Sequence, residues 1–310
     1  MLREQGRDCR CLVRPGSSVE PLQRLGAELT FGDITKEDTL LGVADGTDCV
    51  IHMATLGHMS NFTVPDSKFE EVNVLGTVNV MREALRAGVK KVLHCSSVAA
   101  MGICTEIPAT EESECRPHHP YGRSKLKAER EVLRLFEQRG LPAVIVRFSM
   151  IYGPGDKRDM LKLARLVKRG FAVKIGHRPK LTPLIHAEDA VRGALLSLEK
   201  GRLGQVYLIT NEQPEPFDNI LSCIQKALEI KRAPLYVPEW AAIAGTALLE
   251  RVFAVAAKPP PITRKNIEST LADRVFSVSK AQRELGFSTH IDPETGITAT
   301  IRWYREQGWV

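Results

Sequence analysis

Two stretches decide the fold: Lys91-Val92-Leu93-His94-Cys95-Ser96-Ser97, and further along Tyr121-Gly122-Arg123-Ser124-Lys125. The first is largely apolar and predicts a buried strand, so Ser97 would stand at the carboxyl edge of a sheet, where α/β proteins bind ligands. Side chains alternate along a strand, so Ser96 would point to the opposite face. In the second, Tyr121 and Lys125 are four residues apart, which places them on one face of a helix about one turn apart.

This tyrosine–lysine pair suggests proton-transfer chemistry. An ammonium close to a phenol favours the phenolate, and it would lower the pKa of Tyr121 from its usual value near ~10. A phenol tuned in this way can exchange a proton with a substrate hydroxyl. By itself the pattern is weak, because a helix that starts with an exposed lysine gives the same letters.

The wider pattern predicts an α/β fold, a Rossmann-like doubly wound parallel sheet with a smaller α+β substrate portion. Strand-like runs alternate with helical patterns, which is typical of a parallel sheet covered on both faces. We expect strands at 8–13, 27–31, 48–53, 90–96, 142–148 and 204–210. The main helices are expected at 66–88, 121–138 and 187–199. A dinucleotide-binding domain is predicted over 1–155 and 186–212, and the substrate portion over 156–185 and 213–310.

Composition excludes several function classes. The 310 residues are 43% hydrophobic and 26% charged, as in ordinary globular proteins. The net charge of +6 is spread along the chain without a long basic run, so we expect no nucleic-acid partner. The seven cysteines have no Cys-x-x-Cys spacing, which indicates neither a metal site nor a disulfide framework. This usage fits a reducing compartment and predicts a cytoplasmic protein.

The segment 240–257 is nearly all apolar but contains Glu250 and Arg251. Three interpretations are open: a buried or lid helix, a peripheral contact with a membrane surface, or a membrane-spanning helix.

Several motifs along the chain resemble those of the extended short-chain dehydrogenase/reductase family. They are Asp33-Ile34, Val50 to Ala54, Asn73 to Thr77, Ser96 to Gly102, Tyr121 to Lys125, and Arg147 to Asp156. Each follows an expected strand or opens an expected helix. The resemblance implies a Rossmann-like fold, NAD or NADP as cofactor, and an oxidoreductase of the epimerase/dehydratase type.

The resemblance also assigns catalytic roles. Tyr121 would be the general acid/base, and Lys125 would lower its pKa and hydrogen-bond the nicotinamide ribose. Ser97 would hold the substrate oxygen, with Ser96 as the alternative. Asn73 would position a water in a proton relay, or would simply bond a neighbouring backbone group. The substrate-binding residues expected are Ser97, Val98, Tyr121 and Tyr152.

For the cofactor, the resemblance places Asp33 and Ile34 at the adenine and Ala54 at the phosphates. Asp33 could equally be a turn residue. Enzymes that use NAD carry an acid after the second strand, whereas those that use NADP carry a basic group. This chain has Arg14 and no acid there, which favours NADP over NAD.

One part of the family pattern is missing from the sequence. These enzymes begin with a strand and a glycine-rich turn that holds the pyrophosphate. Here the sequence starts at what resembles the tail of the first helix. We expect either a start codon assigned too late or a shortened form of the protein. A sheet without that strand would expose two edges.

The same residues serve two reactions, alcohol/ketone interconversion and nucleotide-sugar epimerisation. The 234–257 stretch is apolar, and the run Pro259 to Arg264 followed by Phe276 to Ala281 resembles the 3β-hydroxysteroid dehydrogenase and dihydroflavonol-reductase branches. Both features favour an apolar sterol, triterpenoid or flavonoid-like substrate. In the alternative, Arg264 or Arg274 would reach a nucleotide-sugar phosphate. A second alternative is a non-catalytic dinucleotide-sensing or assembly protein. By analogy, a homodimer would form through helices 66–88 and 121–138.

Overall fold

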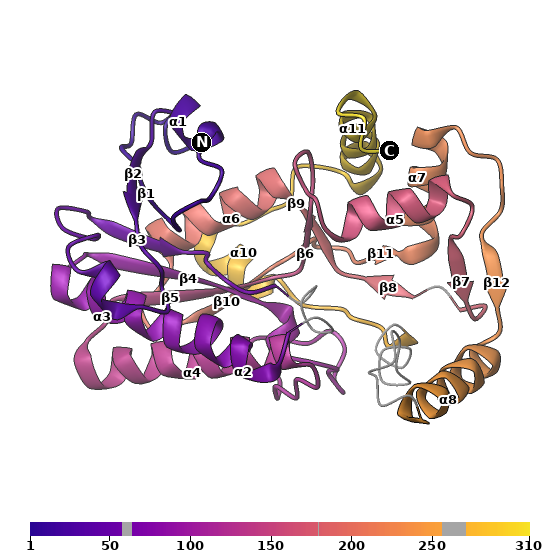
Figure 1. Cartoon of the computed structure of the whole chain (residues 1–310), viewed down its shortest axis with the longest axis horizontal. Helices are drawn as coiled ribbons and strands as arrows, with labels where there is room; N and C mark the ends of the chain where they lie inside the picture. Colours follow the sequence, from indigo (N-terminus) through magenta and orange to yellow (C-terminus); the bar gives the residue numbers. More distant parts are fainter. Residues whose placement is uncertain (58–63, 179, 256–270) are drawn as a thin grey trace.

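The computed structural model describes residues 1–57, 64–178, 180–255 and 271–310 (Figure 1). Its longer strands are β1 (Arg10–Val13), β2 (Glu28–Phe31), β3 (Cys49–His52), β4 (Lys91–Ser97), β5 (Ala143–Phe148) and β10 (Val206–Ile209). Short strands are β6 (Met150–Tyr152), β7 (Val173–Ile175), β8 (Leu181–Thr182), β9 (Leu184–His186), β11 (Glu215–Pro216) and β12 (Leu235–Val237).

The main helices are α1 (Glu20–Arg24), α2 (Asp66–Phe69), α3 (Gly76–Ala87), α4 (Pro120–Arg139), α5 (Asp159–Lys168), α6 (Ala187–Lys200), α7 (Phe217–Leu228), α8 (Glu239–Val255), α10 (Ser279–Leu285) and α11 (Pro293–Glu306). Between α2 and α3 the chain forms a π-helical turn, η3 (Glu70–Leu75), and short 3₁₀ turns lie at Glu37–Leu40 and Val98–Ala100. The expected long helix at 66–88 is therefore one rod with a π-helical turn in its middle.

A four-stranded parallel sheet in the order β10-β5-β4-β3 forms the centre of the molecule. Helices α3 and α4 cover one face, and α6 and α10 cover the other (Figure 1). Strand β5 is buried at every position, as expected for a central parallel strand covered on both faces. The predicted doubly wound α/β architecture is confirmed, and all six expected strands are present.

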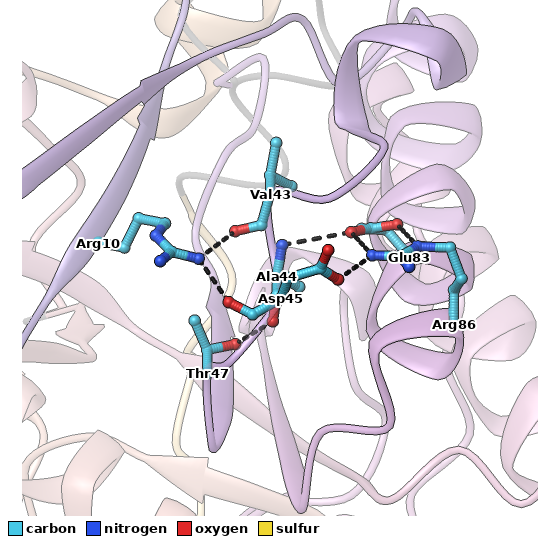
Figure 2. Close-up of polar contacts among 7 residues, drawn as sticks. All are labelled: Arg10, Val43, Ala44, Asp45, Thr47, Glu83 and Arg86. Carbon is cyan, nitrogen blue, oxygen red and sulfur yellow. Dashed lines mark hydrogen bonds and ion pairs between the residues drawn. The ribbon is translucent and has the colours of Figure 1, made fainter.

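Strands β1 and β2 form a separate parallel pair beside this sheet. Side chains, rather than a backbone ladder to β3, tie the pair to the molecule (Figure 2). The Arg10 guanidinium donates to the Val43 and Asp45 carbonyls, at 3.3 and 2.7 Å, in the loop before β3. On α3, Arg86 pairs with the Asp45 carboxylate and with Glu83 at 2.6 Å. Within the described ranges β1 and β2 pair only with each other, so β3 ends the four-stranded sheet.

A second hydrophobic cluster lies beyond the carboxyl end of the sheet. It joins α5, α7 and α11 around Tyr152 and Leu184, and its fully buried aromatic rings include Tyr304. It falls within the portion predicted to bind substrate, and the domain boundaries remain a prediction.

Helix α4 is placed by its sequence at both ends. Pro120 occupies its first turn, where a missing N–H costs nothing, and Gly140 ends it in the left-handed conformation (φ 68°). Gly122 lets the helix approach the turn after β4 closely, because a Cβ there would lie 2.4 Å from the Ala99 carbonyl oxygen. This close approach brings Tyr121 next to the end of β4.

The apolar segment 240–257 forms most of α8, although residues 256–257 lie outside the described ranges. In the described part of the chain, no helix combines the length and apolarity needed to cross a membrane.

Candidate active site

The carboxyl end of β4 brings Ser97 and Tyr121 together. Ser97 ends the strand, and its hydroxyl accepts the Ala99 N–H at 3.2 Å. Tyr121 stands in the first turn of α4, and its phenol hydrogen-bonds Ser97. Ser96 points to the other face, where it bonds Glu129. The expected choice between the two serines therefore agrees with the contacts: only Ser97 meets the phenol.

The pKa of the Tyr121 phenol differs from the expectation. Burial raises it, and the Ser97 hydrogen bond opposes that rise only in part. The Arg158 charge also lowers it, whereas Lys125 is not among the groups that shift the pKa of Tyr121. The Lys125 Nζ donates to the Cys95 carbonyl at 2.7 Å. In this state the phenol is protonated at neutral pH and is a proton donor.

The pKa of the Lys125 ammonium is itself strongly lowered. Its side chain is 3% exposed, and burial lowers its pKa to about 8, against the opposing influence of Cys95 and Glu129. Two buried imidazoles, His52 and His94, stack 5.5 Å apart on neighbouring strands, and burial together with Lys125 holds both pKa values low. Both imidazole rings are therefore neutral at pH 7, so neither adds a positive charge next to the Lys125 ammonium.

The low pKa of Lys125 predicts a pH dependence of stability. From pH about 8 to about 10.5, the unfolded chain holds a lysine proton that the folded protein has released. The unfolding free energy should therefore gain a rising contribution with pH across that window. In Lys125→Met, this contribution should be absent. Urea unfolding of both proteins at a series of pH values measures it, and identical pH profiles would contradict a buried lysine with a lowered pKa.

Sequence reasoning missed a buried ion pair beneath this site. Glu129, one turn after Lys125 on α4, is 2% exposed, and Arg147 of β5 is 5% exposed. Arg147 donates from Nη2 at 2.8 Å and from Nε at 3.1 Å to the two carboxylate oxygens. The Ser96 hydroxyl donates to the same carboxylate. Glu129 and Arg147 each look like ordinary helix and strand residues in the sequence. The four-residue spacing of Tyr121, Lys125 and Glu129 could nevertheless have indicated that the three side chains share one face of α4.

Asn73 lies in the π-helical turn and is fully committed to the protein. Its Oδ1 accepts from Leu56 N at 2.7 Å and from Thr55 Oγ1 at 3.0 Å. Its Nδ2 donates to the Leu56 carbonyl at 3.1 Å and to Ser124 Oγ at 2.9 Å. An asparagine amide has two donors and two acceptor positions, so none is left for a water. The side chain ties α4 to the loop after β3, and the relay role remains a proposal.

A cleft of about 570 Å³ lies at the carboxyl ends of β1 and β2. Its lining combines a glycine-containing loop with two cations and one carboxylate: Arg14, Pro15, Gly16, Ser17, Phe31, Gly32, Asp33, Lys36 and Thr39. The two predicted cofactor residues Arg14 and Asp33 therefore share one cleft. Lys36 was not expected there. An open cleft with two cations suits the phosphorylated ribose and the adenine of a dinucleotide.

The remaining cofactor candidates occupy different surroundings. Asp33 Oδ1 accepts from the Thr35 N–H at 2.9 Å and from its hydroxyl at 2.8 Å, the contacts expected of a turn residue. Ile34 is buried against Gly76 of α3, where a Cβ would lie 2.7 Å from Ile34 Cδ1. Ala54 is exposed in the loop after β3. The cofactor roles of all three remain predictions.

The substrate candidates lie around the ends of β4 and β6. Val98 is buried in the turn after Ser97. Tyr152 lines a smaller cleft of about 370 Å³ with Gly153 and Arg158, but its ring is fully buried and packs edge-on against His186 at 5.4 Å. Its ring therefore reaches a substrate only after movement. Among the described residues, no three His, Cys, Asp or Glu side chains gather as a metal site would require.

The model of the NAD dependent epimerase/dehydratase family matches residues 1–210. Sterol demethylase protein B of Methylococcus capsulatus is 28% identical over 319 residues, covering 100% of this chain and 94% of that protein. A 4-hydroxy-2-methyl-3-oxo-4-farnesyl-3,4-dihydroquinoline-1-oxide ketoreductase of Stigmatella aurantiaca is 28% identical, covering 95% of this chain and 89% of that protein.

Solved structures agree on the fold. UDP-glucose 4-epimerase of Thermotoga maritima, solved with UDP-glucose, superposes with a TM-score of 0.80 over 99% of this chain and 93% of that chain. At 19% identity this likeness speaks for the fold alone. The family match covers well over half of the sequence, and it confirms the resemblance drawn from the motifs. The chain belongs to the NAD dependent epimerase/dehydratase family and is an enzyme that uses a nicotinamide cofactor.

Proposed function

We propose that this enzyme interconverts an alcohol and a ketone on an apolar small molecule, with Tyr121 as the general acid/base. The observation that carries the proposal is the hydrogen bond between Tyr121 and Ser97 at the end of β4, with Lys125 buried one turn further along α4. The bound nicotinamide supplies or accepts the hydride. In the reducing direction Tyr121 gives its phenolic proton to the substrate oxygen, and in the oxidising direction it takes that proton back.

Ser97 and Lys125 support this proton transfer in different ways. The Ser97 hydroxyl would hydrogen-bond the substrate oxygen beside the phenol. Lys125 would hydrogen-bond the nicotinamide ribose and so hold the cofactor beside Tyr121. A lysine with a pKa of about 8 can also take up or release a proton near neutral pH.

The apolar substrate is supported by two similar proteins, one named for a sterol and one for a farnesylated ketone. The alternative, nucleotide-sugar epimerisation, is the reaction of the fold neighbour. The nucleotide-sugar alternative relied on Arg264 or Arg274 to bind a phosphate. Arg264 lies outside the described residues. Arg274 is described, and burial lowers the pKa of its guanidinium.

Product analysis separates the two reactions. We expect the purified enzyme to reduce a hydrophobic ketone, such as a 3-ketosteroid, with one cofactor oxidised for each carbinol formed. An inverted nucleotide sugar with no net change in the cofactor would defeat the redox proposal.

The dimer through α3 and α4 remains a proposal, which the molecular mass in solution tests.

We further propose that Arg14 and Lys36 make the enzyme prefer NADP, because both line the cleft expected to hold the ribose phosphate. A charge-assisted hydrogen bond contributes about 1.5–3 kcal/mol. Arg14→Ala combined with Lys36→Ala should therefore raise the KM for NADPH by at least about tenfold while the KM for NADH changes little. Steady-state kinetics with both cofactors measures this, and a preference for NADH in the unmutated enzyme would overturn it.

A further inference from the structure

The small parallel sheet of β7 and β12 carries an apolar face that is only partly covered. The register pairs Val173 with Leu235 and Ile175 with Val237, so these four side chains share one face of the sheet. Val173 and Leu235 are 41% and 46% exposed. Just before β7, the Phe171 side chain is 63% exposed.

Helix α8 follows β12 at one end of the molecule (Figure 1), and it carries further exposed apolar side chains. Trp240 in the first turn of α8 is 74% exposed, and Leu248 is 64% exposed. We call six exposed apolar and aromatic residues of these elements the β7–β12 surface, leaving out Tyr236 because alternation places it on the other face of the sheet: Phe171, Val173, Leu235, Trp240, Leu248 and Leu249. Monomeric soluble proteins rarely leave so many large apolar side chains together in water without an interaction partner.

Four cations lie at one end of this surface. Lys168 and Arg169 lie just before Gly170 and Phe171, while Lys231 and Arg232 lie four and three residues before β12, and all four are exposed. The two pairs are close in space: Arg232 Nη1 lies 2.7 Å from the position that a Cβ on Gly170 would take. Within the part of the chain that the structure describes, none of these four side chains forms an ion pair with a carboxylate. Their charge is thus available to a partner.

We propose that the β7–β12 surface and these four cations dock the enzyme onto an anionic phospholipid bilayer. Exposed aromatic and aliphatic side chains beside unpaired lysine and arginine are the chemistry that recognises such a surface, because the rings enter the interface while the cations meet the lipid phosphates. This inference goes beyond the proposed reaction and does not depend on it, since no residue of the Tyr121 site takes part.

Vesicle flotation tests the proposal with the full-length enzyme. We expect it to float with vesicles of phosphatidylcholine and phosphatidylserine and to remain unbound with phosphatidylcholine alone. Each cation near an anionic surface favours binding about fivefold, so replacing all four with glutamine should weaken binding at least about 100-fold. Raising the salt concentration should weaken it as well. Phe171→Ser combined with Trp240→Ser should lower binding by at least about tenfold.

Matched control variants test whether a loss of binding comes from the β7–β12 surface and its cations or from any loss of charge or apolar surface. Replacing Arg24, Arg130, Arg139 and Arg302 with glutamine removes the same charge from exposed positions elsewhere. Leu25→Ser combined with Leu41→Ser removes exposed apolar groups elsewhere. Both control variants should bind vesicles like the parent, and circular dichroism should show that every variant is folded. The proposal is overturned if the parent does not float with anionic vesicles. It is also overturned if the controls lose as much binding as the surface variants, or if the Phe171 and Trp240 variant binds unchanged.

Discussion

Tyr121→Phe should lower kcat for carbonyl reduction by about 10²–10⁴-fold, the usual contribution of a positioned general acid. The substitution removes one hydroxyl and keeps the ring, so the packing at the start of α4 is preserved. What is lost is the phenolic proton that lies next to Ser97. Because the phenol does not carry the binding of the cofactor, the KM for the cofactor should change little.

Tyr304→Phe is the matched control for this variant. Tyr304 is a fully buried tyrosine in the second hydrophobic cluster, and its hydroxyl has no hydrogen-bond partner among the described residues. Its removal should leave kcat unchanged. Steady-state rates for both variants, with circular dichroism to check folding, measure the difference. If Tyr121→Phe turned over at the parent rate, another group would have to be the acid.

Glu129→Gln should destabilise the protein by about 3–5 kcal/mol. The substitution leaves the Arg147 guanidinium buried without its counter-charge, and removing one partner of a buried pair is far more costly than losing a surface pair. Arginine cannot escape this cost by deprotonation. Nη1 of Arg147 already lacks a hydrogen-bond partner among the described residues, so its nitrogens have little alternative bonding.

Two further variants isolate the cause of this loss. Glu131→Gln on the same helix removes an acid from an exposed pair with Arg134 and should cost less than about 1 kcal/mol. Glu129→Gln combined with Arg147→Met removes both buried charges and should recover much of the lost stability. Denaturant unfolding of the three variants measures these free energies. If Glu129→Gln and Glu131→Gln cost the same, the buried pair would have no special role.

The sequence predicted the elements whose signals are local. Strand β4 and the start of α4 follow from an apolar run and from Pro120, and alternation along the strand correctly separated Ser97 from Ser96. The π-helical turn at Asn73 was not predicted, because the periodicity of 66–88 indicates one regular helix. Local pattern was sufficient for β4 and the start of α4 because each depends on residues within a few positions of one another.

What could not be predicted depends on residues far apart in the chain. The pairing of Glu129 with Arg147 requires a helix to pack on a particular strand, and Lys36 enters the cleft only through the loop after β2. The pKa of Tyr121 was expected to fall under the influence of Lys125, but it rises because the phenol is buried. Burial is a property of the whole fold, so spacing along one helix cannot give the sign of such a shift.

The most direct test of the central claim is the transfer of a labelled hydride. The enzyme is incubated with a hydrophobic ketone and with reduced nicotinamide cofactor that carries deuterium at both C4 positions, and the product is analysed by mass spectrometry. Our account predicts one deuterium on the carbinol carbon, and the same label appearing about 10²–10⁴-fold more slowly with Tyr121→Phe. A carbinol formed without deuterium, or labelling at an equal rate with Tyr121→Phe, would contradict it.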